Sequence, residues 1–341
     1  MTRTLAGLDL VFAYGVRDVL CGASVAACAG RVTALVGPSG SGKSTLLWLL
    51  AGLLEPKGGR VVVCESPEEV RTKGRPADFA HLRIGMVFQA SALWEHLTAE
   101  EHLSLVLAGK GLDRAERRRR AEETLARLRL APLRRRRPGQ LSGGERRRLA
   151  IARALVADPE WLLLDEPLVH LDGQMRADLF ELLREILAGT RAGVLMATHD
   201  AAEAMRLADE IVVLTEGAVA QGGPPQEVYR RPVTLAVARM LGPASEVAGD
   251  ASGGRLSRGG HTVLENLPPD LAGPQRLILR PEDVEFVPAG AGPATVRRAE
   301  FDGSAYLLTV DAAGIAVGVR HPEKVAPGAA GRLRLRPNVG R

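Results

Sequence analysis

Residues 32–45 read VTALVGPSGSGKST, and this stretch decides the fold. The apolar segment Val32–Val36 predicts a short buried strand. Residues 37–45 follow it directly and fit the pattern G-x-x-x-x-G-K-[ST], and the apolar run from Ser44 to Leu54 predicts the helix after them. A chance glycine-rich turn is the alternative, but a strand before it and a helix after it are the setting that the phosphate-binding pattern requires. The sequence therefore predicts a nucleotide-phosphate site.

The residue types of this turn explain that prediction. Glycines let the backbone wrap a phosphate with its N–H groups pointing inward, and the N-terminus of the helix adds positive potential. Lys43 supplies a positive charge to the β- and γ-phosphates, and Ser44 can ligate Mg²⁺. The predicted nucleotide-binding residues are Gly37, Pro38, Ser39, Gly40, Ser41, Gly42, Lys43, Ser44 and Thr45.

A second motif is the run WLLLDEP at residues 161–167, which predicts a fully buried strand ending in two carboxylates. Burying carboxylates is costly unless something cationic receives them. Asp165 is placed to hold Mg²⁺, directly or through water, and Glu166 is placed to orient or deprotonate an attacking water. Two acidic residues at a strand end can also be a simple loop cap, but the phosphate-binding motif upstream favours the catalytic interpretation.

A third motif, LSGGE at residues 141–145, predicts the start of a helix. Ser142 followed three residues later by Glu145 is a capping box, and a glycine-rich helix N-terminus is also an anion site. The two interpretations are compatible.

Strands and helices alternate over most of the chain. The predicted strands are 32–36, 61–63, 83–88, 161–167 and 193–200, and the predicted helices are 44–54, 112–130, 143–157, 173–188 and 201–207. This alternation favours a mainly parallel α/β sheet with ligand chemistry at the carboxyl ends of its strands. The composition changes near residue 243. Residues 242–260 are small and polar, which predicts a linker or exposed loops. Short alternating runs after it predict a small all-β domain, with strands at 277–280, 284–287, 295–301, 306–310, 315–320 and 332–336.

The three motifs in this order and at this spacing resemble the nucleotide-binding domain of ABC-transporter ATPases, over residues 1 to about 240. The resemblance implies a P-loop fold with a helical subdomain, a homodimer, and ATP and Mg²⁺ as ligands. It also assigns further roles by motif. Tyr14 matches the aromatic residue that stacks on adenine, and Gln89 matches the Q-loop glutamine that senses Mg²⁺. His199 matches the switch histidine at the γ-phosphate, and Asp172 matches the D-loop aspartate. In the homodimer each P-loop faces the signature of the partner, here Ser142, Gly143, Gly144 and Glu145.

The chain departs from the family pattern at two points. Glu145 stands where the family usually has Gln, which keeps the capping box but adds negative charge near bound phosphate. We expect Arg146, Arg147 and Arg148 to offset it. Val169-His170 stands where the family commonly has Ser-Ala, so a serine contact across the dimer is missing.

Two further segments resemble the importer branch of this family. ALWEHLTAEEHL (92–103) resembles the segment that contacts a coupling helix of the permease, and ILRPEDVEF (278–286) resembles the transport-associated OB-like (TOBE) domain. The expected domains are therefore an ABC ATPase domain at 1–240 and a small TOBE-like β-barrel at 245–341. The implied partners are transmembrane permease subunits and, through them, an extracytoplasmic solute-binding protein. The implied place is peripheral, at the cytoplasmic face of the inner membrane. The implied cargo is a small solute of ferric iron, sulfate, polyamine or phosphonate type.

Composition and charge restrict the alternatives. The 341 residues are 46% hydrophobic and 25% charged, which excludes wholesale disorder and suits two or three domains. No apolar run approaches the roughly 20 residues of a membrane-spanning helix, and Met1–Leu10 has no signal-peptide pattern, so we expect neither. Three cysteines without metal-ligand spacing predict buried small residues.

Basic residues concentrate at 113–137, which hold eleven Arg and four acidic residues. The arginine runs 117–120 and 134–137 are interpreted first as a solvated helix face, then as a surface for anionic lipid, and only third as a nucleic-acid site, so no nucleic-acid partner is expected. A soluble ABC ATPase acting on nucleic acid or ribosomes is the alternative function, and an exporter ATPase is another. An importer is favoured because the chain has a predicted β tail and because we find neither a long coiled coil nor a second nucleotide domain in this sequence.

Overall fold

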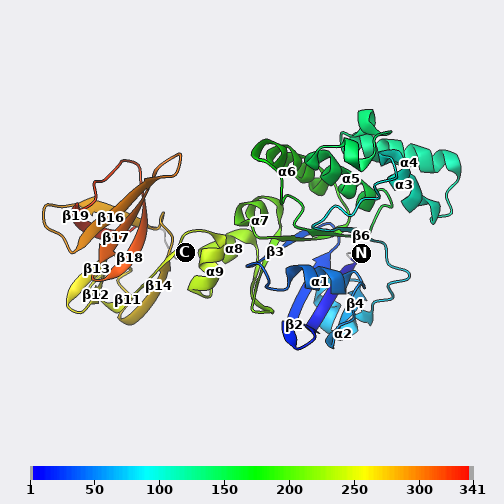
Figure 1. Cartoon of the computed structure of the whole chain (residues 1–341). Coiled ribbons are helices and arrows are strands. Elements are labelled where there is room, and N and C mark those ends of the chain that lie inside the picture. The colour runs from blue at the N-terminus through cyan, green and yellow to red at the C-terminus, as the bar shows by residue number, and fades with distance from the viewer. Residues whose placement is uncertain (1–2, 338–341) are drawn as a thin grey trace. The chain divides into compact units, whose positions relative to one another are not determined.

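The computed structural model describes residues 3–337 and divides into two compact units, Met1–Val228 and Tyr229–Arg341. The first unit contains the phosphate-binding stretch, two sheets and most of the helices, and the second is built largely of strands (Figure 1).

The central sheet of the first unit has six strands in the order β10-β9-β3-β8-β7-β6. Its strands are β3 (Val32–Val36), β6 (Ile84–Val87), β7 (Trp161–Asp165), β8 (Gly193–Thr198), β9 (Glu210–Thr215) and β10 (Ala218–Gly223). All neighbours are parallel except β9 and β10. The predicted parallel α/β sheet is therefore confirmed. The register pairs Val36 with Thr198, Asp165 with Ala197 and Val87 with Leu164, so three predicted motifs leave the sheet at one edge.

A second sheet, of four antiparallel strands in the order β2-β1-β4-β5, covers the other side of helix α1. Its strands are β1 (Thr4–Tyr14), β2 (Arg17–Cys28), β4 (Gly58–Cys64) and β5 (Arg75–Pro76). The predicted strand at 61–63 lies in β4, whereas β1 and β2 were not predicted. Helix α1 (Lys43–Leu50) buries four leucines between the two sheets, which explains why its sequence is apolar on almost every side: Leu46, Leu47, Leu49 and Leu50.

The remaining helices of the first unit lie mostly on one side of the central sheet (Figure 1). They are α3 (Ala99–Ala108), α4 (Arg114–Arg127), α5 (Gly143–Leu155), α6 (Gly173–Ala188) and α7 (Ala201–Leu207), with α2 (Val70–Lys73) beside β4 and α8 (Pro225–Arg230) at the end of the unit. The predicted helices 173–188 and 201–207 match α6 and α7, and α3 was not predicted. Helices α3, α4 and α5 contact one another and form the expected helical subdomain. Within residues 3–337 no helix has the length and apolar character needed to cross a membrane.

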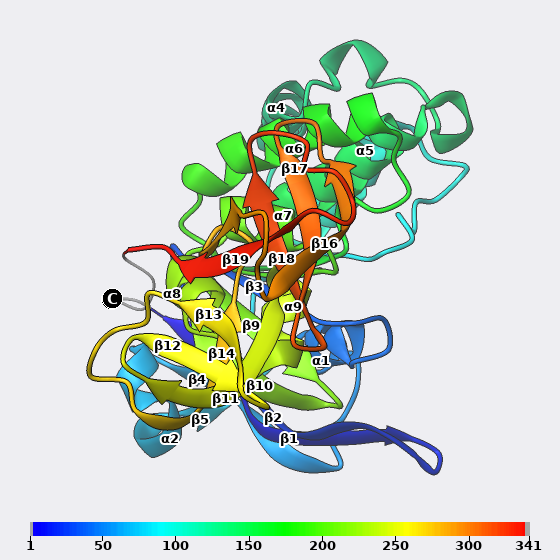
Figure 2. The ribbon, with the colours of Figure 1, turned by 90° about the vertical axis from the view of Figure 1, so that its left-hand side faces the viewer.

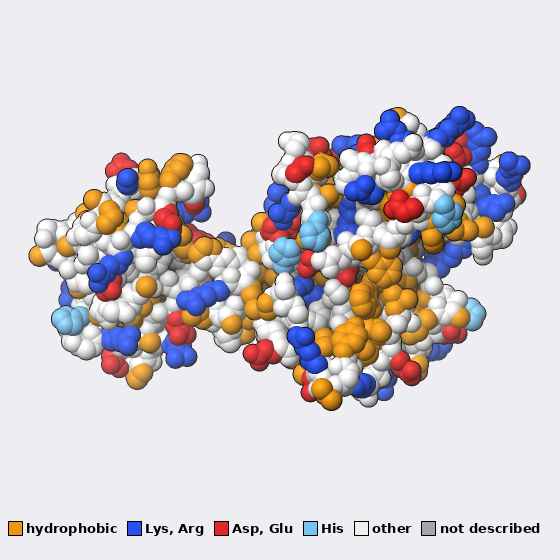
Figure 3. Space-filling view, viewed as in Figure 1, with side chains coloured by type: hydrophobic (Ala, Val, Ile, Leu, Met, Phe, Trp, Pro, Cys, Tyr) orange, Lys and Arg blue, Asp and Glu red, His pale blue; other side chains and the backbone are white. Residues whose placement is uncertain are grey.

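The arginine run on α4 is largely engaged in ion pairs on its own helix. Arg119 contacts Glu116 and Glu123, and Arg118 contacts Glu122. These pairs support the interpretation as a solvated helix face. Figure 3 shows Lys and Arg side chains gathered with acidic ones over this end of the first unit.

The second unit begins with α9 (Leu235–Leu241) and continues as a nine-stranded sheet in the order β14-β11-β12-β13-β19-β16-β17-β18, with β15 paired to β19. Its strands are β11 (Ser245–Ser252), β12 (Arg255–Arg258), β13 (His261–Glu265), β14 (Gly273–Leu279), β15 (Val284–Pro288), β16 (Ala294–Phe301), β17 (Tyr306–Ala312), β18 (Ile315–His321) and β19 (Ala330–Leu335). In Figure 2 the yellow strands β11–β13 run across the direction of the orange β17 and β18, as in a strongly twisted sheet. The small β domain is confirmed.

The expectation of a linker or exposed loops at residues 242–260 was wrong. This stretch forms β11 and β12, which pair with each other; β11 also pairs with β14, and β12 also pairs with β13. Its glycines made the sequence look like a linker, but Gly253-Gly254 and Gly259-Gly260 lie at hairpin turns with positive φ, where glycine carries no steric cost. Val247, Ala251 and Leu256 supply the apolar side chains that bury these short strands in the core.

A buried arginine fastens α9 to the strands within the second unit. Arg280 is 4% exposed, and its guanidinium donates to the carbonyl oxygens of Ala238 at 2.7 Å and Gly242 at 3.1 Å. It also lies 4.0 Å from the ring centroid of Tyr229. Carbonyls at a helix C-terminus lack partners within the helix, so a cation there is favourable. Residues 229–243 therefore fold as part of the second unit.

Candidate nucleotide-binding and hydrolysis site

A cleft of about 570 Å³ opens at the carboxyl edge of the central sheet. Its walls hold ten of the residues predicted for the site together with four others: Tyr14, Arg17, Val19, Ser39, Gly40, Gly42, Lys43, Ser44, Thr45, Gln89, Glu166, Val169, His170 and His199. They come from segments far apart in sequence, and the shared strand register brings them together.

The glycines of the turn have the conformations that a phosphate-binding loop needs. Gly40 and Gly42 have φ of 80° and 101°, where side-chain-bearing residues are strained. A Cβ on Gly37 would lie 2.2 Å from the carbonyl oxygen of Leu214, so no larger residue fits there. The Oγ of Ser41 is buried and has no hydrogen-bond partner among the described residues. An unpaired donor inside a backbone cradle fits a bound anion.

Lys43 lies under this loop with 5% of its surface exposed. Its Nζ donates to the carbonyl oxygens of Gly37 at 2.8 Å and Pro38 at 3.0 Å. Burial lowers the pKa of Lys43, while the carboxylates of Glu166 and Asp165 oppose that shift. A bound phosphate would give this cation the opposite charge that carbonyl dipoles supply only in part.

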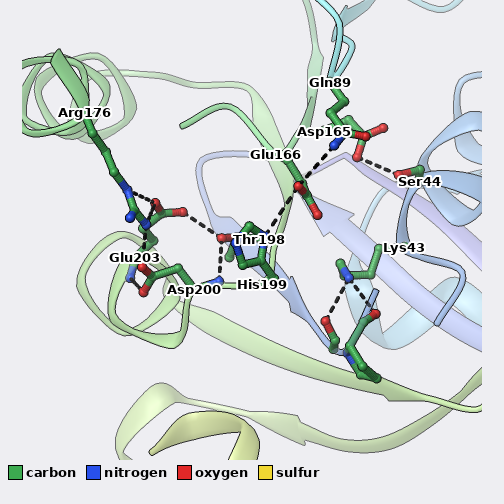
Figure 4. A network of polar contacts seen from close by, with 12 residues as sticks. Lys43, Ser44, Gln89, Asp165, Glu166, Arg176, Thr198, His199, Asp200 and Glu203 are labelled. Atoms are coloured by element: carbon green, nitrogen blue, oxygen red, sulfur yellow. Dashed lines mark hydrogen bonds and ion pairs between the residues drawn. The ribbon is translucent and has the colours of Figure 1, made fainter. Parts of the chain in front are cut away.

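Ser44 and Asp165 meet beside the loop (Figure 4). The Ser44 hydroxyl donates to Oδ1 of Asp165 at 2.8 Å, and Asp165 is 1% exposed. Desolvation raises the pKa of Asp165, against the effect of its hydrogen bond to Ser44 and its attraction to Arg147 and Lys43. A hydroxyl and a carboxylate oxygen are the hard donors that Mg²⁺ prefers. The pair therefore fits a magnesium ion.

Glu166 lines the cleft in a strained backbone conformation. Its φ is 45°, and its N–H donates to the carbonyl oxygen of Ala197 at 3.0 Å. Its Oε2 lies 3.5 Å from Nε2 of Gln89 and 3.4 Å from Nδ1 of His199 (Figure 4). A non-glycine residue in the left-handed region costs about 1–3 kcal/mol and often marks a functional position. Here that conformation presents the carboxylate to both predicted partners.

A polar network that the sequence analysis did not predict holds Thr198 and Asp200, the residues on either side of His199. Thr198 donates its hydroxyl to Oε2 of Glu203 at 2.6 Å and accepts from the N–H of Asp200 at 3.0 Å. Arg176, from the start of α6, pairs with both Asp200 and Glu203 (Figure 4). No local sequence signal reveals this network. Glu203 is 7% exposed only in the folded chain, and a buried carboxylate of this kind needs a cation nearby.

Tyr14 lies at the mouth of the cleft, at the end of β1, with 48% of its surface exposed. Its ring meets Phe12 edge-to-face, with centroids 5.0 Å apart, which leaves a face free for another ring. Arg17 follows on β2, and a Cβ built on Gly40 would lie 4.0 Å from its guanidinium. Arg17 was not predicted for the site. It could have been suspected as a cation three residues after the aromatic.

The signature residues do not line this cleft. Ser142 caps α5, accepting from Glu145 N at 3.2 Å, while Ser142 N donates to Glu145 Oε2 at 2.7 Å, so the predicted capping box is confirmed. Gly143 and Gly144 form the first turn, and a Cβ on Gly144 would lie 3.2 Å from Sδ of Met175. Arg146 donates to the carbonyl oxygen of Leu141 at 2.9 Å.

Asp172 also lies outside the cleft walls. Its carboxylate caps α6 by accepting from Met175 N at 3.0 Å. The geometry thus gives Asp172 a helix-capping role.

A lysine under a glycine-rich loop, a serine–aspartate pair beside it and a carboxylate facing an imidazole are the parts with which P-loop proteins hydrolyse nucleoside triphosphates. The cleft therefore places the chain in the class of P-loop nucleoside triphosphatases.

Comparisons with known proteins narrow the class. Residues 20–169 match the family model described as "ABC transporter". The chain is 39% identical over 315 residues to the sulfate/thiosulfate import ATP-binding protein CysA of Xanthomonas campestris pv. campestris, spanning 90% of this chain and 89% of that protein. It is 37% identical over 314 residues to the sn-glycerol-3-phosphate import ATP-binding protein UgpC of Jannaschia sp. (strain CCS1), spanning 91% and 88%. It is 36% identical over 287 residues to the Fe(3+) ions import ATP-binding protein FbpC 1 of Rhizobium meliloti (strain 1021), spanning 82% and 78%.

A solved structure agrees with these matches. The cbiO1 protein of Clostridium perfringens, part of the ABC transporter complex cbiONQ, superposes with a TM-score of 0.58 at 30% identity, covering 67% of this chain and 90% of that one. The chain belongs to the ABC transporter family, and within it to the ATP-binding subunits, which hydrolyse ATP. The resemblance to ABC-transporter ATP-binding subunits is confirmed, and the TOBE-type domain stays a prediction.

Proposed function

We propose that this chain is the subunit that binds and hydrolyses ATP to drive uptake of a small solute through separate permease subunits. The observation that carries the proposal is the cleft in which Lys43, Ser44 and Glu166 meet at one sheet edge. Relatives whose names describe import ATP-binding proteins, each aligned over more than three quarters of this chain, support the direction of transport.

Nucleotide binding uses the loop and the cleft mouth. Tyr14 stacks on the adenine ring, the backbone N–H groups of residues 39–45 bind the phosphates, and Lys43 neutralises the β- and γ-phosphates. Ser44 and Asp165 would hold Mg²⁺, with Gln89 near it, and that ion supplies charge neutralisation on the phosphate oxygens.

Hydrolysis begins at Glu166. Its carboxylate orients a water molecule and accepts a proton as the water oxygen attacks the γ-phosphorus. The bond from the γ-phosphorus to the bridging oxygen breaks, and ADP leaves with that electron pair. His199, 3.4 Å from the same carboxylate, contacts the γ-phosphate and keeps Glu166 oriented.

A single chain does not complete this site. Ser142 and Gly144 begin a helix suited to a phosphate, yet neither lines the cleft of its own chain. We propose a head-to-tail homodimer in which Ser142, Gly143, Gly144 and Glu145 of each copy close the cleft of the other, with Asp172 at the interface. A two-fold axis then produces two equal sites.

We propose further that the first unit is the ATPase domain and the second a TOBE-type domain. The sequence sets their limits at residues 1–240 and 245–341, but residues 229–240 fold within the second unit, where Arg280 binds the end of α9. Residues 92–103 would contact the permease, and a solute-binding protein would act on the other side of the membrane. The chain would then lie peripherally at the cytoplasmic face of the inner membrane. The proposed cargo remains a small solute of ferric iron, sulfate, polyamine or phosphonate type. Relatives named for different cargoes have similar sequence identity to this chain, so identity selects no single cargo from this set.

The test is affinity purification of the tagged chain from detergent-solubilised membranes of its own host, with Lys43→Ala as the control that should still assemble. We expect a multi-span membrane protein in constant ratio to the chain. Recovery with ribosomes or nucleic acid and without a membrane protein would contradict import and support the soluble alternative.

A further inference from the structure

Arg147 is a buried cation with no carboxylate partner in a hydrogen bond or ion pair among the described residues. It lies in the second turn of α5, is 3% exposed, and burial lowers its pKa to about 10, so it stays charged at neutral pH. Its acceptors are all backbone carbonyl oxygens. Nε donates to Pro167 at 2.8 Å, and Nη2 donates to Asp165 at 3.1 Å and to Glu166.

The third nitrogen reaches a different segment. Nη1 donates to the carbonyl oxygens of Phe88 and, at 2.9 Å, of Gln89. One guanidinium therefore binds the chain where it leaves β6 and where it leaves β7. These neighbouring strands are parallel, and their last paired residues are Val87 and Leu164.

The two segments carry the side chains that meet in the cleft. Gln89 Nε2 lies 3.5 Å from Glu166 Oε2, and Arg147 holds the backbone of both residues. Asp165 and Glu166 attract this cation, but neither carboxylate reaches it with a hydrogen bond or ion pair, so its burial is still costly. An apolar residue would pack the same space at lower cost. An ion kept there at such a cost suggests a function beyond packing.

We propose that Arg147 is a positioning residue that fixes the backbone of Glu166 relative to Gln89 and ties both to α5, the helix that Ser142 begins. Displacement of α5 would then be transmitted to the hydrolytic carboxylate through this one side chain. The proposal rests on the proposed roles of Glu166 and Gln89.

Arg153 is a matched control on the same helix. It is also partly buried, its pKa is also lowered by burial, and its guanidinium donates to the carbonyl oxygens of Ala92 and Ser91. It further lies 5.2 Å from the ring centroid of Trp94. The chemistry is the same, but the segment it holds carries neither Gln89 nor Glu166.

The experiment compares Arg147→Lys, Arg147→Met and Arg153→Lys in the full-length chain. The readouts are Tm, the Kd for ATP, and kcat and KM for hydrolysis. Arg147→Lys keeps the positive charge but loses the planar guanidinium group that donates to both segments. We expect it to lower kcat roughly 10- to 100-fold, as displacement of a catalytic group does. The Kd for ATP should stay near the wild-type value. Arg153→Lys should keep wild-type kcat even if its Tm falls equally.

Combining Arg147→Lys with Glu166→Gln distinguishes failure of the Arg147 proposal from failure of the role assigned to Glu166. Glu166→Gln alone should lose hydrolysis, and adding Arg147→Lys should lower the residual rate no further, because the positioned group is already absent. If Glu166→Gln is inactive but Arg147→Lys keeps wild-type kcat with a lower Tm, Arg147 is only structural and the proposal is overturned. If Glu166→Gln itself keeps wild-type kcat, the role of Glu166 fails first. If Arg147→Met does not fold, Arg147→Lys still decides.

Discussion

Glu166 Oε2 lies 3.4 Å from Nδ1 of His199 and 3.5 Å from Nε2 of Gln89. The three residues follow three parallel strands of one sheet, so the contact is made by the register of β6, β7 and β8. A carboxylate held between an amide and an imidazole has a fixed direction, which is what a group that orients water requires.

Replacing Asp165 by Asn should stabilise the nucleotide-free protein at neutral pH. Burial raises the pKa of Asp165, so the ionised carboxylate destabilises the fold above that raised pKa. As pH falls through it, the folded state takes up the proton before the unfolded chain does, and the penalty disappears. We expect Asp165→Asn to add about 0.5–2 kcal/mol to the free energy of unfolding at pH 7.5, and less as the pH approaches 4.

Denaturant unfolding of both proteins at several pH values, without nucleotide or Mg²⁺, measures this difference. The same variant should lose Mg²⁺-dependent hydrolysis. An Asn variant that is less stable than the wild type at pH 7.5 would mean that the interactions of Asp165 with Ser44 and nearby cations outweigh its desolvation.

Replacing Tyr14 by Ala should weaken ATP binding by about 1–3 kcal/mol, the range for a base stacked on an aromatic ring. Tyr14→Phe keeps the ring and should bind almost as the wild type does. Titration calorimetry with ATP compares the three proteins. Equal losses in both variants would show that the hydroxyl is needed and that stacking is not.

Truncation should separate the two units at α8, before α9. A chain ending at Arg230 should stay soluble and bind ATP, because the motifs lie before it and the first unit has its own core. A chain ending at Ala244 should also bind ATP but be less soluble, because α9 keeps its apolar residues and loses Arg280. Size-exclusion chromatography and ATP binding compare the two. If the shorter chain is the one that aggregates, the second unit contributes to folding of the first.

Lys43→Ala and Ser142→Arg should each be inactive alone, because every site of either homodimer carries one defect. Their heterodimer would have one site with both defects and one with neither. Purified through two tags, the heterodimer should therefore trap ATP at one site. A heterodimer that traps no more ATP than either parent would rule out the composite site.

Much of the fold and the cleft was predictable because its residues lie in contiguous motifs. The strand at 32–36 and the helices at 173–188 and 201–207 follow from local apolar patterns. Strands β1 and β2 did not, because their Ala, Gly and Cys residues alternate weakly and their burial comes from packing on α1. Strands β11 and β12 were missed because glycine hairpins read as a linker.

The side-chain roles that escaped prediction depend on tertiary contacts. Arg147 follows Arg146 and precedes Arg148 in a basic run, and only the helix orientation decides which of them is buried. Arg176 and Glu203 are 27 residues apart and pair because α6 and α7 contact each other. Local sequence contains no record of such pairings.

The most direct test of the proposed mechanism is single-turnover hydrolysis by the Glu166→Gln protein, measured beside ATP binding. Gln keeps the size of the side chain but cannot accept a proton, so hydrolysis should fall by about 100-fold or more while the affinity for ATP is retained and ATP-bound dimer accumulates. Hydrolysis at the wild-type rate by this variant would contradict the assignment of Glu166 and, with it, the mechanism proposed for the cleft.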